Sequence, residues 1–255
     1  MEVYLQEVRS CKRETLNAGE NAMKTKGTRS MQEILDDQLH KWKAVSVKRE
    51  KEPSINVITI SREAGSAGRE IAERLAQDLG YDFFAHELIH KVAESAKMRD
   101  PIIESLDEKA HSLLKDLILS LTDKQHLWPY EYLNHLIKVI GAIAICGRAV
   151  ILGRGAQFIL PPAETLRVRV VAPLEMRVKN LAHELKISAD EGERRVARDD
   201  ADRKAFARKY FNANLDDLSH YDLIINSWYL GLDASVETIK TALKLKQIPT
   251  PVWKR

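Results

Sequence analysis

The segment SREAGSAGRE, residues 61–70, combines small residues with a following arginine. It follows the apolar run 56–60 and precedes a helix-like stretch, residues 71–79. Small residues let backbone N–H groups approach phosphate oxygens closely, and a helix N-terminus adds its positive dipole end. The segment therefore predicts a phosphate-binding loop whose contact residues are Glu63, Ala64, Gly65, Ser66, Ala67, Gly68, Arg69 and Glu70.

The loop departs from the standard phosphate-loop pattern G-x-x-x-x-G-K-[ST]. Placing the second glycine of the pattern on Gly68 puts Arg69 at the lysine and Glu70 at the hydroxyl residue, and the first glycine falls on Glu63. Arg69 keeps the positive charge and can bind phosphate oxygens through two donors. Ser66 is then the candidate to assist Mg²⁺. A turn needed only for packing is the alternative.

A second candidate is Arg154, which follows the buried apolar run 149–153. An arginine at the end of such a strand, between Gly153 and Gly155, projects into the crevice where α/β sheets bind ligands. We expect Arg154 to anchor an anion, the alternative being an ion pair with a nearby carboxylate.

A third candidate is the arginine-rich segment RRVARDDADRKAFARK, residues 194–209. Arg194, Arg198 and Asp202 share one helical face at four-residue spacing. A solvated face with ion pairs is the alternative to phosphate binding. The preference for arginine over lysine favours phosphate, because guanidinium groups make two-donor contacts.

The elements that would position these residues alternate between strands and helices. Strands are expected at 56–60, 81–84, 149–153, 166–171 and 222–226. Helical periodicity covers about 86–145, a helix runs from Pro173 to about Leu185, another begins at Ser188, and Asp233 starts the last. Apolar strands separated by helices predict a parallel sheet covered on both faces, which is a three-layer α/β/α fold.

The composition of the chain argues against some classes of function. The net charge is +3, with 40 basic and 37 acidic residues, which argues against a nucleic-acid or membrane-surface binder. The two cysteines are far apart in the chain, and the sequence shows neither an apolar run long enough for a transmembrane helix nor the apolar core of a signal peptide, so we expect a cytoplasmic protein. Residues 1–53 form a separate N-terminal arm, in which an amphipathic helix near 31–45 could support a homodimer.

Four quoted segments together resemble the cytidylate kinase-like family, a branch of the P-loop nucleoside monophosphate kinases. They are ITISREAGSAGREIA, VILGRGAQFILPPA, RRVARDDADRKAFARKYF and YDLIINSWYLGLDASVETI, and the resemblance covers about 54–246. It implies a five-stranded parallel sheet within a kinase-like domain at 54–250, a nucleoside monophosphate (NMP)-binding helical part at about 86–145 and a lid at about 188–212. The arginine after the second glycine is typical of the branch.

The resemblance also implies roles for individual residues. Arg154 matches the arginine of the G-R-D motif that holds the monophosphate, but Gly155 replaces its aspartate. Arg198, Asp199, Asp202 and Arg203 match the lid motif R-D-x-x-D-R. Asp202 would contact the acceptor, whereas Arg69, Arg198 and Arg203 would stabilise the transferring phosphoryl group.

The function expected from the sequence is phosphoryl transfer from ATP and Mg²⁺ to a CMP-like or dCMP-like acceptor. Three alternatives are a nucleotide-binding protein without turnover, a scaffold that assembles through the N-terminal arm, and a kinase for a non-nucleotide small molecule. The string His86-Glu87-Leu88-Ile89-His90 also matches the zinc-protease pattern H-E-x-x-H. We expect no zinc there, because the segment falls within the kinase resemblance.

Overall fold

The computed structural model describes residues 56–246 except 105, 107 and 125–130. These residues all belong to one compact unit. The expected N-terminal arm, residues 1–53, lies outside the described residues, as does its amphipathic segment near 31–45.

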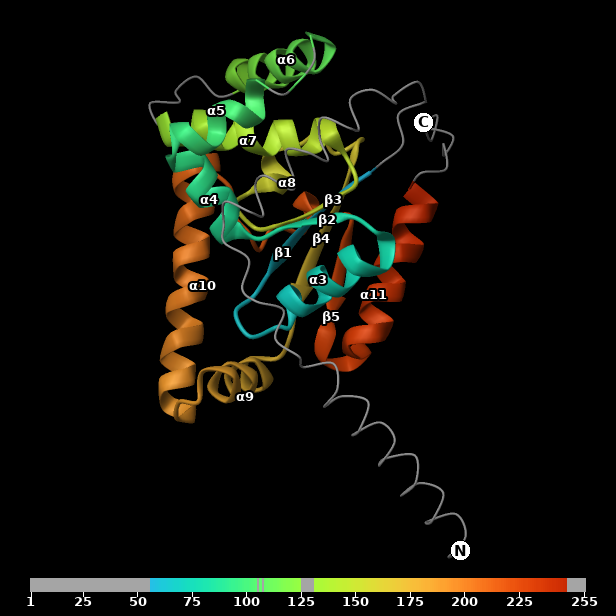
Figure 1. Cartoon of the computed structure of the whole chain (residues 1–255). Helices are drawn as coiled ribbons and strands as arrows, with labels where there is room; N and C mark the ends of the chain where they lie inside the picture. Colours follow the sequence, from blue (N-terminus) through green and yellow to red (C-terminus); the bar gives the residue numbers. More distant parts are fainter. Residues whose placement is uncertain (1–55, 105, 107, 125–130, 247–255) are drawn as a thin grey trace, which may run out of the picture. The chain divides into compact units, whose positions relative to one another are not determined.

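A five-stranded parallel sheet forms the centre of the fold, as the strand pattern predicts (Figure 1). Its strand order is β2-β3-β1-β4-β5, and each neighbouring pair is parallel. The carboxyl ends of all five strands therefore meet at one edge, where the candidate residues follow β1 and β3. The strands are β1 (Val57–Arg62), β2 (Asp82–Phe84), β3 (Ala149–Leu152), β4 (Thr165–Val171) and β5 (Leu223–Asn226).

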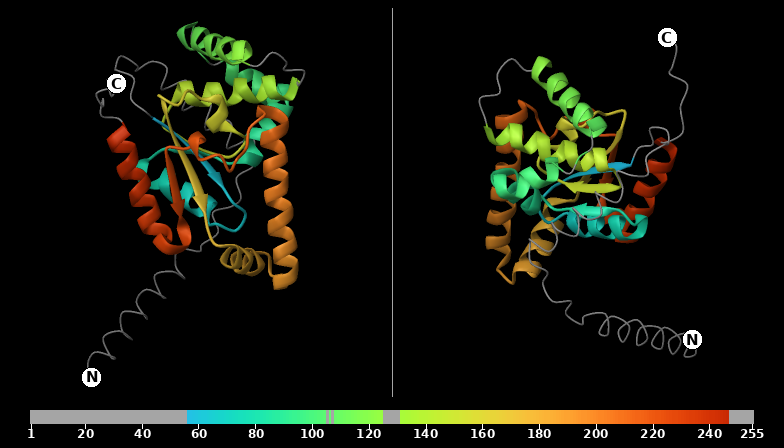
Figure 2. Two further views of the ribbon diagram at one scale, coloured as in Figure 1. Left: turned by 180° about the vertical axis from the view of Figure 1, so that it is seen from behind. Right: turned by 45° about the horizontal axis from the view of Figure 1, so that its top comes forward.

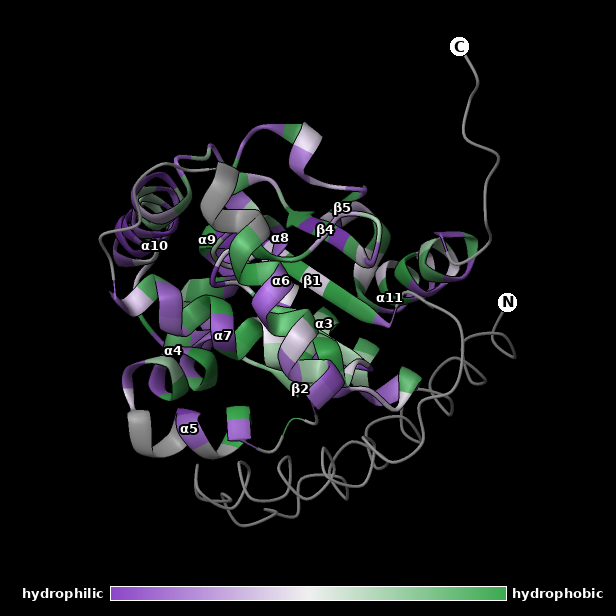
Figure 3. Cartoon of the chain, turned by 90° about the horizontal axis from the view of Figure 1, so that it is seen from above, coloured by the Kyte–Doolittle hydropathy of each residue, from purple (hydrophilic) through white to green (hydrophobic). Residues whose placement is uncertain are grey.

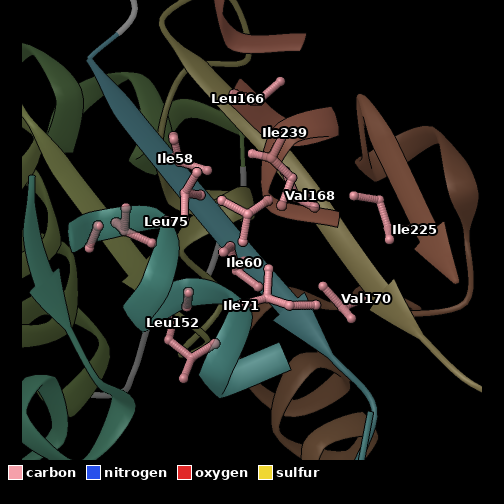
Figure 4. Close-up of a cluster of buried hydrophobic side chains, with 14 of the residues drawn as sticks. Ile58, Ile60, Ile71, Leu75, Leu152, Leu166, Val168, Val170, Ile225 and Ile239 are labelled. Carbon is pink, nitrogen blue, oxygen red and sulfur yellow. The ribbon is translucent and has the colours of Figure 1, made fainter. Parts of the chain in front are cut away.

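Helices cover both faces of the sheet, which confirms the three-layer prediction (Figures 1 and 2). On one face lie α3 (Gly68–Leu79) and α11 (Ser227–Lys246), and on the other lie α7 (Glu131–Cys146) and α8 (Ala156–Ile159). Alternate residues of β1 and β4 bury their side chains against α3 and α11, and Figure 4 shows this core. Its central members are Ile58, Ile60, Ile71, Leu75, Leu166, Val168 and Ile239.

Two helical insertions flank the sheet. Between β2 and β3 come α4 (His86–Glu94), α5 (Ala96–Glu104), α6 (Glu108–Lys124) and α7. Between β4 and β5 come α9 (Leu174–Leu185), α10 (Ala189–Phe211) and the short 3₁₀ helix Leu218–His220. The helical regions expected at 86–145 and 188–212 are thus present. Figure 3 shows α10 as predominantly hydrophilic and β1 as predominantly hydrophobic.

Capping residues mark the ends of several helices. Gly80 closes α3 in the left-handed conformation, and the Ser188 hydroxyl accepts from the Glu191 amide at the start of α10. The last helix differs from expectation: α11 begins at Ser227, and a non-helical residue at Gly231 divides its first turn from the part that starts near Asp233. None of the described helices has the length and apolar composition needed to cross a membrane.

Candidate phosphate-binding site

The loop after β1 leads directly into α3 and presents its first amides. Ala67 has φ 55 and caps the helix, which begins at Gly68. The first intrahelical bond comes from the Ile71 amide to the Ala67 carbonyl. Within the described part of the chain, the amides of Gly68, Arg69 and Glu70 meet no acceptor. Free amides at a helix N-terminus suit an anion, so phosphate binding by this loop stays a prediction with a suitable backbone geometry.

The loop carbonyls are held from outside by two other helices. Asn180 Nδ2 on α9 donates to the Gly65 carbonyl at 3.0 Å, and the Ser227 hydroxyl on α11 donates to the Ser66 carbonyl at 2.7 Å. A Cβ at Gly65 would collide with the Arg177 backbone, so only glycine permits this approach. These contacts fix the loop rigidly beside α9.

Two side chains assigned to ligand contact instead brace the loop. Glu63 Oε2 accepts from the Ala172 amide at 3.1 Å and lies 3.3 Å from Arg177 Nε. The Ser66 hydroxyl is buried and donates to the Glu63 carbonyl at 2.9 Å. The sequence places both residues in the loop correctly, but the structure directs their side chains into its scaffold.

The carboxylate of Asp200, on α10, joins the loop to the lid region. Its Oδ1 accepts from the Ala64 amide at 2.8 Å, and its Oδ2 lies 2.6 Å from Arg177 Nη1. Arg203 Nη1 adds a contact of 3.3 Å to Oδ1. The Ala64 amide therefore already binds a carboxylate, which is the kind of group that an anion-binding site accepts.

The residues of α10 are divided between two faces. Val196, Asp200, Arg203 and Ala207 recur every three or four residues and face the rest of the domain, since Val196 and Ala207 are buried. Arg198 and Asp202 lie on the exposed face instead. Of the four expected lid residues, the structure brings Arg203 to the loop and leaves Arg198 and Asp202 facing solvent, while Asp199 pairs with Arg195.

Arg69, the expected fixed cation, is engaged by two carboxylates. Its guanidinium lies 3.0 Å from Glu73 Oε1 and 2.9 Å from Glu87 Oε1, and its side chain is half exposed. Both contacts raise the pKa of Arg69, although burial acts in the opposite direction. Much of its charge is therefore balanced within the protein.

Arg62, which sequence reasoning did not select, reaches the centre of the site. Its side chain crosses Gly68, where a Cβ would lie 2.5 Å from Arg62 Cβ, and its guanidinium abuts Gly153. Arg62 Nη2 lies 3.0 Å from His86 Nδ1. Burial, together with the neighbouring charges of Arg203, Arg69 and Arg154, lowers the pKa of Arg62 to about 9, while Glu87 acts in the opposite direction.

His86 serves Arg62 as a neutral acceptor. Burial, together with the charge of Arg62, lowers the pKa of His86 to about 4. Its Nδ1 also lies 3.0 Å from Glu87 Oε2, which would require a proton on that nitrogen. The lowered pKa favours the neutral imidazole, and the neutral tautomer that carries its proton on Nε2 can accept from Arg62 through Nδ1. Among the described residues no three potential ligands cluster for a metal, so the H-E-x-x-H match gains no support.

Arg154 follows β3 in a strained turn, at the position expected from the sequence. Gly153, Arg154 and Gly155 have φ values of 79, 54 and 69, and a positive φ costs energy at a residue other than glycine. Arg154 Nε donates to the His86 carbonyl at 3.3 Å, and its guanidinium lies 5.3 Å from the centre of the Phe206 ring. The turn thus holds a guanidinium near those of Arg62 and Arg203.

The glycine that replaces the aspartate of the G-R-D motif has a steric cause. A Cβ at Gly155 would lie 2.6 Å from Phe211 Cζ and 2.9 Å from Cδ2. Phe211 is buried and packs beside Phe158 and Phe206. The ring of Phe211 therefore occupies the space that a side chain at position 155 needs.

The parallel sheet and the loop after β1 define a P-loop kinase-like α/β fold. Over residues 57–229 the sequence matches the Cytidylate kinase-like family, and the chain belongs to that family.

Curated relatives agree with this assignment, and a solved structure supports the fold. A cytidylate kinase from Ignicoccus hospitalis is 28% identical over 190 residues, covering 74% of this chain and 99% of the relative. One from Methanopyrus kandleri is 24% identical over 197 residues, covering 73% and 92%. The crystal structure of an uncharacterized protein from Eubacterium ventriosum has a TM-score of 0.58 at 20% identity, covering 75% of this chain and 99% of that one, and supports the fold.

Proposed function

We propose that this chain transfers a phosphoryl group from ATP to a nucleoside monophosphate, CMP-like or dCMP-like, or to a related small phosphorylated acceptor. The observation that carries the proposal is the meeting of Arg62, Arg154 and Arg203 beside the free amides of α3. Phosphoryl transfer depends on positioning and charge neutralisation, which converging guanidinium groups and amides provide.

The loop, three of the arginines and the flanking helices have distinct roles in this proposal. Loop 63–70 cradles the donor phosphates through its amides, with Arg69 at its rim. Arg154 holds the acceptor phosphate, and Arg203 neutralises charge on the group in transit. The helices at 86–145 form the acceptor side, and α10 acts as the lid, with Arg198 and Asp202 turning inward only if the lid rotates.

Mg²⁺ would reach this site on the nucleotide. The Ser66 hydroxyl, the candidate ligand, is buried and donates to a loop carbonyl, and no group of three acidic or histidine residues gathers in the described regions. Mg²⁺ commonly keeps several waters and binds phosphate oxygens with few protein ligands. The described residues therefore fit an ion carried by ATP and do not form a dedicated metal cage.

Nucleotide binding without turnover is the second candidate function. The Ala64 amide already donates its hydrogen bond to the Asp200 carboxylate, and Gly155 supplies no carboxylate that could bind the acceptor. Under this alternative ATP binds, but none of the monophosphates is phosphorylated. The scaffold role of the N-terminal arm concerns residues outside the described part and stays a prediction.

The test is a turnover screen of the purified chain with ATP and Mg²⁺ against all common nucleoside monophosphates. We expect one pyrimidine monophosphate to be preferred, and Arg203→Gln to reduce kcat by about 10³-fold or more. Arg195→Gln is the matched control, because Arg195 is on the same helix but pairs with Asp199 on the exposed side. ATP binding with no turnover of any acceptor would establish the second candidate in place of the first.

A further inference from the structure

The conformation of the loop shows how its residues correspond to the standard pattern. Glycine is the default residue where the backbone is left-handed, and Ala67 has φ 55 just before the helix, whereas Gly68 is already helical. The second glycine of G-x-x-x-x-G-K-[ST] thus corresponds in conformation to Ala67. With this placement, the first glycine of the pattern corresponds to Arg62 of this chain, its lysine to Gly68 and its hydroxyl residue to Arg69.

In this alignment the loop has exchanged the positions of its glycine and its cation. The standard pattern has glycine first and lysine six residues later, whereas this chain has Arg62 first and Gly68 six residues later. The exchange is sterically coupled, because a Cβ at Gly68 would lie 2.5 Å from Arg62 Cβ and 3.0 Å from Cγ. A side chain at position 68 and the observed path of Arg62 exclude each other.

The charge of Arg62 is not neutralised by a bonded carboxylate. Its hydrogen-bond partner is the uncharged His86, and among the described residues it forms no ion pair. Arg69, by contrast, contacts two carboxylates. A half-buried, unpaired guanidinium among other arginines is costly, and an anionic ligand would relieve that cost. The lowered pKa of Arg62 reflects the same surroundings.

We propose that Arg62 is the phosphate-binding cation of this site, reaching the terminal phosphates of the donor from the first-glycine position across Gly68. Arg69 then has a lesser role at the rim. The proposal deepens the proposed function and rests on it for the identity of the donor, but binding of polyphosphate tests it separately.

The first test compares three arginines by calorimetric titration with inorganic tripolyphosphate and with ATP. We expect Arg62→Gln to weaken binding by about 10- to 100-fold, as for the loss of a charged hydrogen bond. Arg69→Gln should weaken it less than about fivefold, because its charge is balanced by Glu73 and Glu87. Arg74→Gln is the control for lost charge, since Arg74 is exposed and pairs with Asp78 on the same helix.

The second test restores the standard pattern. Gly68→Lys alone should lower the melting temperature, because the new side chain collides with Arg62. Arg62→Gly alone should lose binding, and the double variant Arg62→Gly with Gly68→Lys should recover both stability and at least about tenfold of the lost affinity. Independent, additive effects of the two substitutions would overturn the proposal.

The outcomes separate this inference from the proposed function. Turnover by the wild-type chain with an unaffected Arg62→Gln variant would overturn the inference and leave the function standing. Tripolyphosphate binding that depends on Arg62, without turnover, would support the inference and refute the function. Failure of the wild-type chain to bind tripolyphosphate and ATP would refute both.

Discussion

Replacing Gly155 with alanine should destabilise the fold more than a comparable replacement elsewhere. Gly155 has φ 69, and a left-handed backbone costs an alanine about 1–2 kcal/mol. The added Cβ would also meet three atoms of the buried Phe211 ring, and such overpacking costs about 1–3 kcal/mol more. We therefore expect Gly155→Ala to lower the free energy of unfolding by about 2–5 kcal/mol.

Gly80→Ala is the matched control. Gly80 has φ 62 and ψ 35, close to the φ 69 and ψ 20 of Gly155, but its Cβ would meet only Arg148 Nη2 at an ordinary 3.6 Å. The control should lose only the backbone component, about 1–2 kcal/mol. Urea unfolding followed by circular dichroism measures both free energies.

A double-mutant cycle with Phe211→Ala isolates the steric component. Removing the ring costs about 3–5 kcal/mol alone, but it frees the space beside Gly155. The loss of unfolding free energy in the double variant should therefore be smaller than the sum of the two single losses by about 1–3 kcal/mol. Equal losses for Gly155→Ala and Gly80→Ala, or an additive cycle, would refute the steric explanation for the missing aspartate.

Two further predictions concern the supports of the loop. Arg177→Met should lower the free energy of unfolding by about 3–5 kcal/mol, because it removes a buried guanidinium that pairs with both Glu63 and Asp200 and leaves Asp200 only the longer contact with Arg203. Lys179→Met at an exposed pair should cost under about 0.5 kcal/mol in the same urea assay. His86 has a folded pKa of about 4, below its ordinary 6.5, so its contribution is complete above pH 6.5 and is lost as pH falls toward 4. Urea unfolding at pH 7 and 4.5 should show the wild-type chain losing roughly 1–3 kcal/mol more than His86→Gln, and equal losses would contradict a neutral His86 bonded to Arg62.

Local sequence was sufficient for the framework of the fold. The five strands were predictable because short apolar runs separated by helical periodicity can be buried only in a parallel sheet covered on both faces. Arg154 was predictable as a candidate because it follows a buried strand, and Ser188 because its side chain caps a helix within four residues. The family resemblance rests on the same contiguous segments and is confirmed by the match over 57–229.

The contacts between distant segments were decided only by the tertiary structure. Helical spacing alone groups Arg198 with Asp202, but packing turns Asp200 and Arg203 toward the loop and leaves that pair exposed. Arg62 escaped selection because its contacts involve Gly68 in α3, His86 in α4 and Gly153 in the turn after β3, which are three separate segments of the chain.

The sequence by itself therefore determined a parallel α/β fold of this family with a loop of small residues that leads from the first strand into a helix, because those features are encoded in contiguous residues. Which guanidinium groups face that loop was decided by the fold, because it depends on the space that glycines leave for side chains from other elements. Gly68 and Gly155 are needed because folding brings Arg62 and Phe211 into the space that a side chain at these two positions would fill.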